Sequence, residues 1–237
     1  MGEAVELAVR GTVGSQAAAR VRECLRAAAV QAPAPLAEVR ARLSALPSGL
    51  VAQVNAEVAG RRVRVQVAAA QARAVADRLA VRFAERVAQA AQGWIPRSWP
   101  HPGTAQPPLG PAPRVARVKT PRLVWCAPEV AVMTMDAMDY DVHVFTDPET
   151  EADAAVFRSG PTGYRLARTV PAPLPRRGRV PLTLAARPTP RLTASRAVAR
   201  LVAAELPFLF FADPIRETGR LLYRRFDGTL GLIASTP

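Results

Sequence analysis

An internal repeat constrains this 237-residue chain more than any other feature of its sequence. The stretch Leu206–Ile233 returns in weaker form at Tyr140–Ala167, shifted by a constant 66 residues and without gaps. A repeat at one fixed offset indicates two copies of one structural unit. The matching positions are Phe145, Asp147, Pro148, Val156, Phe157, Arg158 and Leu166, which fall on Phe211, Asp213, Pro214, Leu222, Tyr223, Arg224 and Leu232.

Each copy predicts one helix followed by three short strands. Turn signals of the Asp-Pro and Asp-Gly types separate the apolar runs. A unit of about 50 residues with open sheet edges needs a partner to cover its apolar surface, and the simplest partner is the other copy in the same chain. The expected elements are helices at Pro128–Met138 and Ala194–Glu205, a strand at Leu123–Cys126 ahead of the first helix, and strands at Leu206–Phe211, Arg220–Phe226 and Leu230–Ile233 in the later copy.

The first 92 residues predict the order βαβββα. Alternation of apolar and polar residues gives the strands one apolar face, on which both helices would pack, and one polar face. The fold class predicted for the chain is α+β: this N-terminal domain, similar to a double-stranded RNA-binding domain with two helices on one sheet face, and two small α+β units with short antiparallel sheets. The expected elements are strands at 3–9, Leu36–Leu46, Leu50–Ala59 and Arg61–Ala68, and helices at Gln16–Val30 and Gln71–Gln92.

Two Pro-rich basic stretches separate these units and act as linkers. Charge changes at the same boundaries, because the first repeat is acidic whereas the domain before it and both linkers are basic. The predicted segments are a basic domain at 1–92, a linker at 93–120, the first repeat at 121–169, a second linker at 170–188 and the second repeat at 189–237.

The chain carries a formal net charge of +13, and Lys119 is its only lysine. Residues 1–92 alone hold 13 Arg against 7 acidic residues. Such an excess predicts attraction to polyanions and a salt-dependent interaction with nucleic acid.

The polar face of the N-terminal sheet is the candidate RNA surface. A solvated sheet face is the ordinary alternative and stays open. Arginine forks match phosphate oxygens, so converging arginines with amides favour contact with RNA phosphates. The candidate RNA-binding residues are Arg40, Arg42, Arg62, Arg64, Gln53 and Asn55 on the sheet, with Arg20, Arg73, Arg78 and Arg82 on the helices.

The sequence lacks the residue patterns that several classes of function require. Cys24 and Cys126 lie far apart without metal or disulfide spacing, which is typical of a reducing cytosol and predicts a cytoplasmic protein. The acidic stretches lack the spacing of a calcium loop, and there is no nucleophile–base pair or phosphate loop. We therefore expect no enzyme activity, metal, cofactor or small-molecule substrate. No apolar stretch is long enough to predict a membrane span or a membrane partner.

The tail combines an aromatic strand with four short motifs: Glu217-Thr218-Gly219, Tyr223-Arg224-Arg225, Asp227-Gly228 and Gly231-Leu232-Ile233. This segment resembles the C-terminal domain of long-form ribosome hibernation promoting factors. The βαβββα domain fits their N-terminal domain by pattern and charge. The first repeat is a degenerate copy, with Phe157-Arg158-Ser159 and Arg165-Leu166-Ala167 in place of two motifs. The duplicated arrangement resembles the dormancy-associated translation inhibitors of GC-rich bacteria.

The resemblance implies that the N-terminal domain sits at the decoding site of the small (30S) subunit and excludes messenger and transfer RNA. It implies 16S rRNA and the 30S subunit or 70S ribosome as partners, and translation inhibition during dormancy or stress. In the family, the C-terminal domain dimerises and joins two ribosomes.

Two repeats in one chain leave several alternatives open. They could pair within the chain as a pseudo-dimer that stabilises single 70S ribosomes, or between chains as a homodimer that forms 100S pairs. A regulatory RNA-binding protein unrelated to the ribosome is a further alternative. The candidate pairing residues are Phe208, Phe210, Leu222, Tyr223, Arg224, Phe145, Val156 and Phe157.

Overall fold

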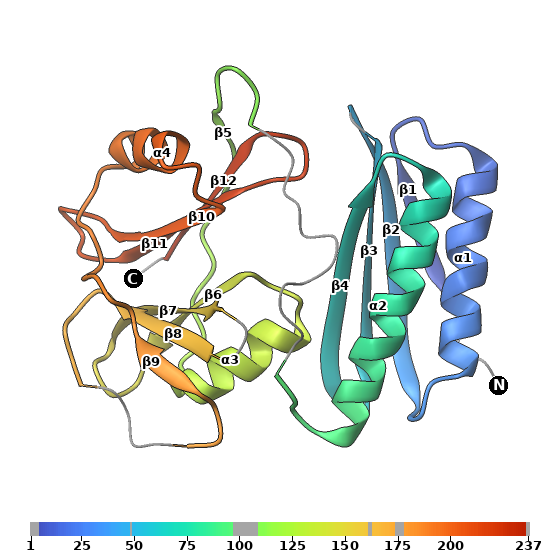
Figure 1. Ribbon diagram of the computed structural model, residues 1–237, viewed down its shortest axis with the longest axis horizontal. Helices are drawn as coiled ribbons and strands as arrows, with labels where there is room; N and C mark the ends of the chain where they lie inside the picture. The colour runs from blue at the N-terminus through green and yellow to red at the C-terminus, as the bar shows by residue number, and fades with distance from the viewer. Residues whose placement is uncertain (1–4, 48, 97–108, 161–162, 174–177, 236–237) are drawn as a thin grey trace. The chain divides into compact units, whose positions relative to one another are not determined.

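The computed structural model of the protein describes residues 5–47, 49–96, 109–160, 163–173 and 178–235. The chain divides into two compact units (Figure 1). The N-terminal unit contains Met1–Arg97, and the C-terminal unit contains Gln106–Met135 and Tyr140–Pro237. Each unit is described by itself.

The N-terminal unit has the predicted βαβββα order. Its sheet runs β1-β2-β3-β4, with β1 parallel to β2 and the other pairs antiparallel. Both helices cover one face of this sheet (Figure 1), so the predicted fold class is confirmed. The elements are β1 (Glu6–Arg10), α1 (Ser15–Val30), β2 (Leu36–Leu46), β3 (Gly49–Val58), β4 (Arg61–Ala69) and α2 (Ala72–Gln92).

One core holds this unit together. Every second residue of β2, β3 and β4 is buried, as a sheet with one covered face requires. Leu43, Val54 and Val65 from the strands are fully buried in one cluster with Leu25 of α1 and Phe83 of α2. The opposite sheet face therefore carries the polar alternate residues.

The C-terminal unit repeats one plan twice. Adding 66 to the bounds of α3 gives those of α4. Two unusual backbone positions repeat as well, because Asp139 and Glu205 both have positive φ, as do Glu151 and Glu217. The elements are β5 (Val115–Lys119), α3 (Pro128–Ala137), β6 (Val142–Asp147), β7 (Ala152–Ser159), β8 (Gly163–Arg168), β9 (Leu182–Leu184), α4 (Ala194–Ala203), β10 (Phe208–Ala212), β11 (Gly219–Arg224) and β12 (Leu230–Ala234).

The two repeats exchange their first strands. β5 precedes α3 of the first repeat but pairs in parallel with β12 of the second, giving the order β10-β11-β12-β5. β9 precedes α4 of the second repeat but pairs in parallel with β8 of the first, giving β6-β7-β8-β9. The registers correspond, since Val118 pairs with Leu232 where Leu184 pairs with Leu166. Each sheet is thus completed by a strand of the other repeat.

This exchange changes the expected organisation in two respects. The three strands after each helix are antiparallel as predicted, but the fourth strand makes each sheet mixed. The exchanged strands lie inside the segments predicted as linkers at 93–120 and 170–188, parts of which (97–108 and 174–177) lie outside the described residues. The strand predicted at Leu123–Cys126 is reduced to a single bridge between Trp125 and Thr146.

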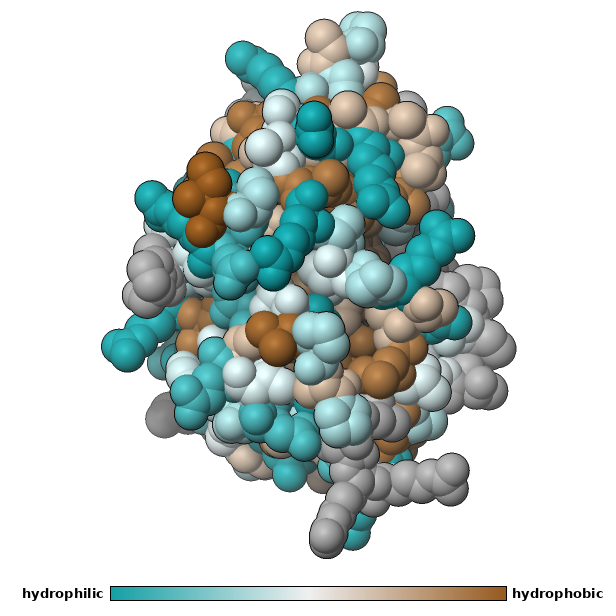
Figure 2. All heavy atoms as spheres, turned by 90° about the vertical axis from the view of Figure 1, so that its left-hand side faces the viewer, coloured by the Kyte–Doolittle hydropathy of each residue, from teal (hydrophilic) through white to brown (hydrophobic). Residues whose placement is uncertain are grey.

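Each sheet packs a helix on one face and the other sheet on the opposite face. On the helix side of the second repeat, Leu201 of α4 is buried with Phe211 and Leu222. On the other side, Val144 and Ala155 of the first repeat cluster with Phe210 and Leu221 of the second. The apolar faces are therefore turned inward, and the molecular face in Figure 2 shows hydrophobic side chains as separate patches among hydrophilic ones.

Candidate nucleic-acid interface and repeat pairing surface

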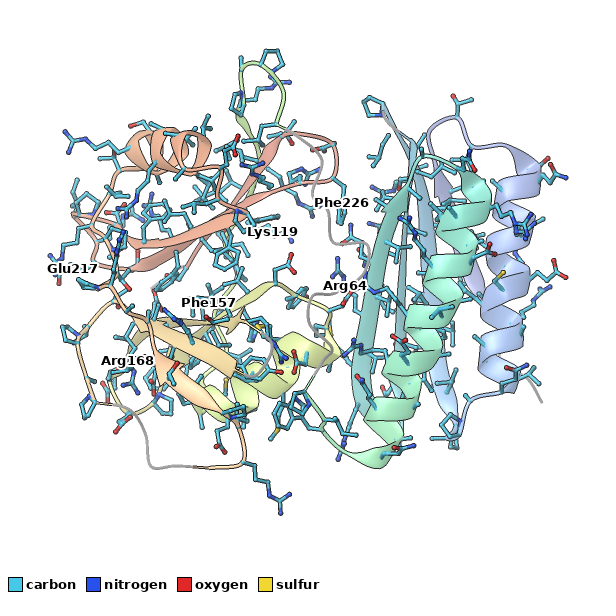
Figure 3. The ribbon with its side chains drawn as sticks, viewed as in Figure 1. Arg64, Lys119, Phe157, Arg168, Glu217 and Phe226 are labelled. Atoms are coloured by element: carbon cyan, nitrogen blue, oxygen red, sulfur yellow. The ribbon has the colours of Figure 1, made fainter. Side chains whose placement is uncertain are left out.

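The six candidate residues on the N-terminal sheet share its polar face. Strand register places Asn55 between Arg40 and Arg64, and Gln53 beside Arg42. Arg40, Arg42 and Arg62 are exposed. Arg64 extends from β4 on the side away from both helices (Figure 3). We call this set of residues the sheet face.

Hydrogen bonds order the centre of the sheet face. The Arg64 guanidinium donates to Gln53 Oε1 at 3.3 Å and also to the Gln66 side chain. The Gln53 amide donates to Asn55 Oδ1 at 3.3 Å. These polar groups are partly buried, so the network holds their donors in a fixed orientation.

The sheet face also carries acidic residues. Arg40 forms ion pairs with Glu6 at 3.6 Å and with Glu38 at 3.8 Å, and Arg62 lies opposite Glu57. Glu6 reaches this face because β1 pairs in parallel with β2. Such exposed pairs contribute only about 0–1 kcal/mol, so the arginines can exchange a carboxylate for a phosphate.

One basic residue of this face was missed. Arg10 pairs in register with Ser44, which follows Arg40 and Arg42 in the alternation of β2. It therefore extends the sheet face onto β1. The alternation of β1 alone could have indicated it, had the pairing partner been known.

The four candidate arginines on the helices belong to the other layer of the unit. Exposed Arg20 and Arg73 both form ion pairs with Asp77, at 3.7 and 3.6 Å. The Arg78 guanidinium donates to the Ala68 carbonyl at 3.3 Å. Arg82 is buried and donates to the Gln66 carbonyl at 3.1 Å. The other nine candidates therefore lie on two layers of one domain, whereas the buried Arg82 side chain belongs to neither exposed surface.

The pairing surface between the two repeats is apolar at its centre. Phe208, Phe210 and Tyr223 belong to the inter-sheet cluster. The Phe157 and Phe208 rings meet edge to face with centroids 5.5 Å apart, and Figure 3 shows Phe157 on the sheet of the first repeat. Edge-to-face contact of this kind adds about 0.5–1.5 kcal/mol to the burial of the rings.

The other candidate pairing residues lie elsewhere. Leu222 is buried under α4 in the core of its own repeat. Phe145 and Val156 are buried next to Val144 and Ala155 along their strands, so alternation turns them away from the inter-sheet layer. Arg224 donates to the Leu206 carbonyl of its own repeat at 2.8 Å.

The candidate pairing residues left out several members of this surface, because six of the eight occupy positions that match between the two copies. Residues identical or similar in both repeats mostly form the two separate cores. The alternate positions, which differ between the repeats, form the contact. The missed residues are Leu123, Val142, Val144, Ala155, Ala167, Leu221 and Ile233.

Turns in the second repeat are fixed by aspartates. Burial raises the pKa of Asp227, but hydrogen bonds from Arg225 and Thr229 outweigh it and lower the pKa to about 2. The backbone N–H groups of Arg216 and Ile215 hold the pKa of Asp213 below its usual range. These carboxylates shape the hairpins, as the local hydrogen bonds of Asx turns do.

Other kinds of site find no support in the described part of the chain. Its His, Cys, Asp and Glu residues form no group of three or more suited to a metal ion. None of the helices in the residues described is long and apolar enough to cross a membrane.

Comparison with known proteins identifies the repeats. Residues 111–166 match the family described as Sigma 54 modulation/S30EA ribosomal protein C terminus. This match covers the degenerate first repeat and includes β5, so the exchanged strand is part of the family's module. The N-terminal domain of Thermus thermophilus Protein Y, in its crystal structure, matches with 19% identity and a TM-score of 0.32 over 37% of this chain and 99% of its own.

The Dormancy associated translation inhibitor of Mycobacterium tuberculosis is 41% identical over 196 residues, in strain CDC 1551 / Oshkosh and in strain ATCC 25618 / H37Rv. The match covers 78% of this chain and 70% of the relative. These relationships define the class as ribosome-associated translation inhibitors with an S30EA-type C-terminal module. The chain belongs to the long-form ribosome hibernation promoting factor family and is similar to its dormancy-associated translation inhibitors.

Proposed function

We propose that this protein halts translation by placing its N-terminal unit on the 16S rRNA of the small subunit, near the decoding region. There it would exclude messenger and transfer RNA during dormancy or stress, in the cytoplasm. The observation that carries the proposal is the sheet face, where arginines of β2 and β4 flank the amides of β3, and where the ion pairs of Arg40 are exposed and weak. Membership of the hibernation factor family supports the ribosome as the target.

The proposed recognition relies on phosphates rather than on bases. Arg40, Arg42 and Arg62 are exposed and present planar donor forks. Structured RNA is recognised mainly by shape and by backbone contacts, because its deep groove hides the base edges. A rigid sheet suits this task, since it holds the forks at fixed spacing. Inhibition then needs only occupancy of the site and no chemical step.

Charge reversal on one layer at a time tests this proposal. The variant R40E/R42E/R62E removes three exposed arginines of the sheet face, and R20E/R73E/R78E makes the same charge change on the helix layer. We expect the first variant to lose co-sedimentation with 30S subunits and the second to retain it. Circular dichroism confirms that both are folded. If only the second variant loses co-sedimentation, the RNA-binding surface lies on the helix layer. If both variants still co-sediment, the N-terminal unit is not the part that binds the subunit.

We further propose that the C-terminal unit acts as an intrachain pseudo-dimer. The reciprocal exchange of β5 and β9 and the shared inter-sheet cluster support this, because the surface available for pairing is already occupied within the chain. The protein would then stabilise single 70S ribosomes.

Sucrose gradients of ribosomes with added protein test this second proposal. We expect an enlarged 70S peak. A 100S peak would favour pairing of ribosomes through intermolecular contacts. Equal binding to protein-free RNA and to intact subunits would favour a regulatory RNA-binding protein unrelated to the ribosome.

A further inference from the structure

The two faces that meet between the repeats differ systematically in size. Positions related by the 66-residue offset occupy equivalent places on the two sheets. At four pairs of these positions in the inter-sheet cluster, the second repeat carries the larger side chain. The pairs, with the first repeat named first, are Val142 and Phe208, Val144 and Phe210, Ala155 and Leu221, and Ala167 and Ile233.

Another pair of equivalent residues has the opposite order of size and joins the two repeats directly. Asp153 and Gly219 are equivalent by the offset, and they touch each other. Residues that contact their own equivalents lie on the pseudo-two-fold axis of a pair. The Asp153 carboxylate accepts hydrogen bonds from the Gly219 N–H at 2.7 Å and from the Ser235 hydroxyl at 2.6 Å.

Gly219 is required for this close approach. A Cβ atom built at Gly219 would lie 2.6 Å from Asp153 Cβ and 3.0 Å from the Phe210 ring. Contacts of 2.6 Å are essentially never made by real Cβ atoms, so only glycine fits opposite Asp153. The larger residue on the axis therefore belongs to the first repeat, whereas the larger residue of each of the four apolar pairs belongs to the second.

Pairs of like repeats would lose this fit. Two second-repeat faces would place Phe210 and Leu221 against further large side chains, and overpacking of a filled core destabilises it. Two first-repeat faces would leave voids at Ala155 and Ala167. They would also bring two Asp153 carboxylates together on the axis, where like charges repel in a partly buried site.

We propose that the pairing surface is specific for unlike repeats, with Asp153 opposite Gly219 on the axis and large-on-small packing around them as its determinants. The partner that fits the first repeat is the second repeat, and the tether supplies it within the same chain at high effective concentration. Symmetric pairing through two identical domains is thereby excluded. This inference rests on the intrachain contacts and is independent of the proposed ribosomal role.

Exchange of equivalent residues within the full chain tests the proposal. Leu221→Ala leaves alanine at both position 155 and position 221, as in a pair of first repeats. Ala155→Leu leaves leucine at both positions, as in a pair of second repeats. The double variant A155L/L221A restores one large and one small residue with their positions exchanged. We expect each single variant to lower the thermal midpoint by several degrees and the double variant to recover more than half of either loss.

A second cycle addresses the axis. Gly219→Asp places a second carboxylate opposite that of Asp153. Asp153→Gly removes the carboxylate that accepts the hydrogen bonds, and D153G/G219D exchanges the two residues. Thr169 is the equivalent of Ser235 and already donates to the Asp153 carbonyl, so it offers a hydroxyl to the exchanged carboxylate. Recovery here is expected to be partial, because Phe210 crowds position 219. The Ala155 and Leu221 cycle remains decisive if Gly219→Asp fails to fold.

The outcomes separate cleanly. Non-additive recovery in the double variants supports unlike-repeat specificity, since a merely local role for each residue predicts that the two losses add. Additive losses would overturn the proposal, as would single variants as stable as the wild type. Sedimentation equilibrium of the wild-type chain should give the 25.3 kDa monomer mass, and a dimer joined through like repeats would overturn it as well.

Discussion

At the scale of single residues, Gly231 leaves the space that the Tyr223 ring fills. A Cβ atom at this position would lie 2.6 Å from Tyr223 Oη and 2.7 Å from its Cε1 atom. The ring belongs to the inter-sheet cluster and has the Lys119 ammonium 5.9 Å above it, so it cannot shift without disturbing the pairing surface. We expect Gly231→Ala to lower the free energy of unfolding by about 1–3 kcal/mol, measured by denaturant titration.

Gly110→Ala is the matched control for this substitution, because a Cβ atom there meets nothing within 4 Å and the backbone is not in the left-handed region. It should leave the unfolding midpoint unchanged. If both alanine variants behave alike, the Tyr223 ring does not depend on Gly231.

His143 gives the first repeat a sensitivity to acid. Burial lowers its pKa from 6.5 to about 4. The folded state therefore resists protonation, so the stability contribution of neutral His143 is complete above pH 6.5 and is lost as the pH falls towards 4. The loss should approach about 3 kcal/mol as an upper limit. Leu209 is the equivalent residue in the second repeat, which makes His143→Leu the natural substitution.

Unfolding free energies of the wild type and His143→Leu, compared between pH 7 and pH 4, check this expectation. The variant should lose less stability over that window. The part-exposed ion pair of Asp227 with Arg225 acts at lower pH, because the Asp227 pKa of about 2 places the loss of its contribution below pH 4. Parallel curves for the two proteins between pH 7 and pH 4 would contradict the assignment to His143.

At the scale of elements, the exchanged strand β5 couples the stability of the two repeats. Val115 of β5 packs against the core of the second repeat, whereas Val118 on the same strand is 59% exposed. Val115→Asp would bury a charge in that core, which strongly disfavours the strand. We expect faster amide exchange in β10, β11 and β12, about a hundred residues further along the chain.

Hydrogen exchange resolved by peptide mass spectrometry measures this effect, and Val118→Asp is the control that should leave the pattern unchanged. Faster exchange confined to the first repeat, in which Val115 lies by sequence, would show that β5 does not support the second sheet in solution.

The same elements mark what the sequence could predict. Period-two alternation and one fixed offset identify β2, β3 and β4 and both repeats, because these are local patterns. The exchange of β5 and β9 depends on pairing between distant segments, which no local pattern encodes. For the candidate site, alternation correctly placed Arg40 and Arg42 on one face, but the carboxylate of Glu6 arrives there only through the parallel pairing of β1.

At the scale of the whole molecule, charge predicts how the protein should respond to salt. A net charge of +13 attracts any polyanion, so binding to RNA alone does not distinguish a specific surface from diffuse attraction. The number of phosphates neutralised sets the slope of affinity against salt concentration, with each lost contact lowering the slope by roughly 1. A defined sheet face therefore predicts that removing its arginines changes the slope and not only the affinity.

We expect R40A/R42A/R62A to reduce the slope of log affinity for 30S subunits against log salt by about 2–3. R20A/R73A/R78A removes the same charge from the helix layer and should lower affinity slightly at low salt while leaving the slope near the wild-type value. Filter binding or fluorescence anisotropy between about 50 and 300 mM salt spans the range over which such contacts are lost. Equal reductions by both variants would indicate diffuse attraction, because a surface that docks in one orientation engages only one layer of the domain.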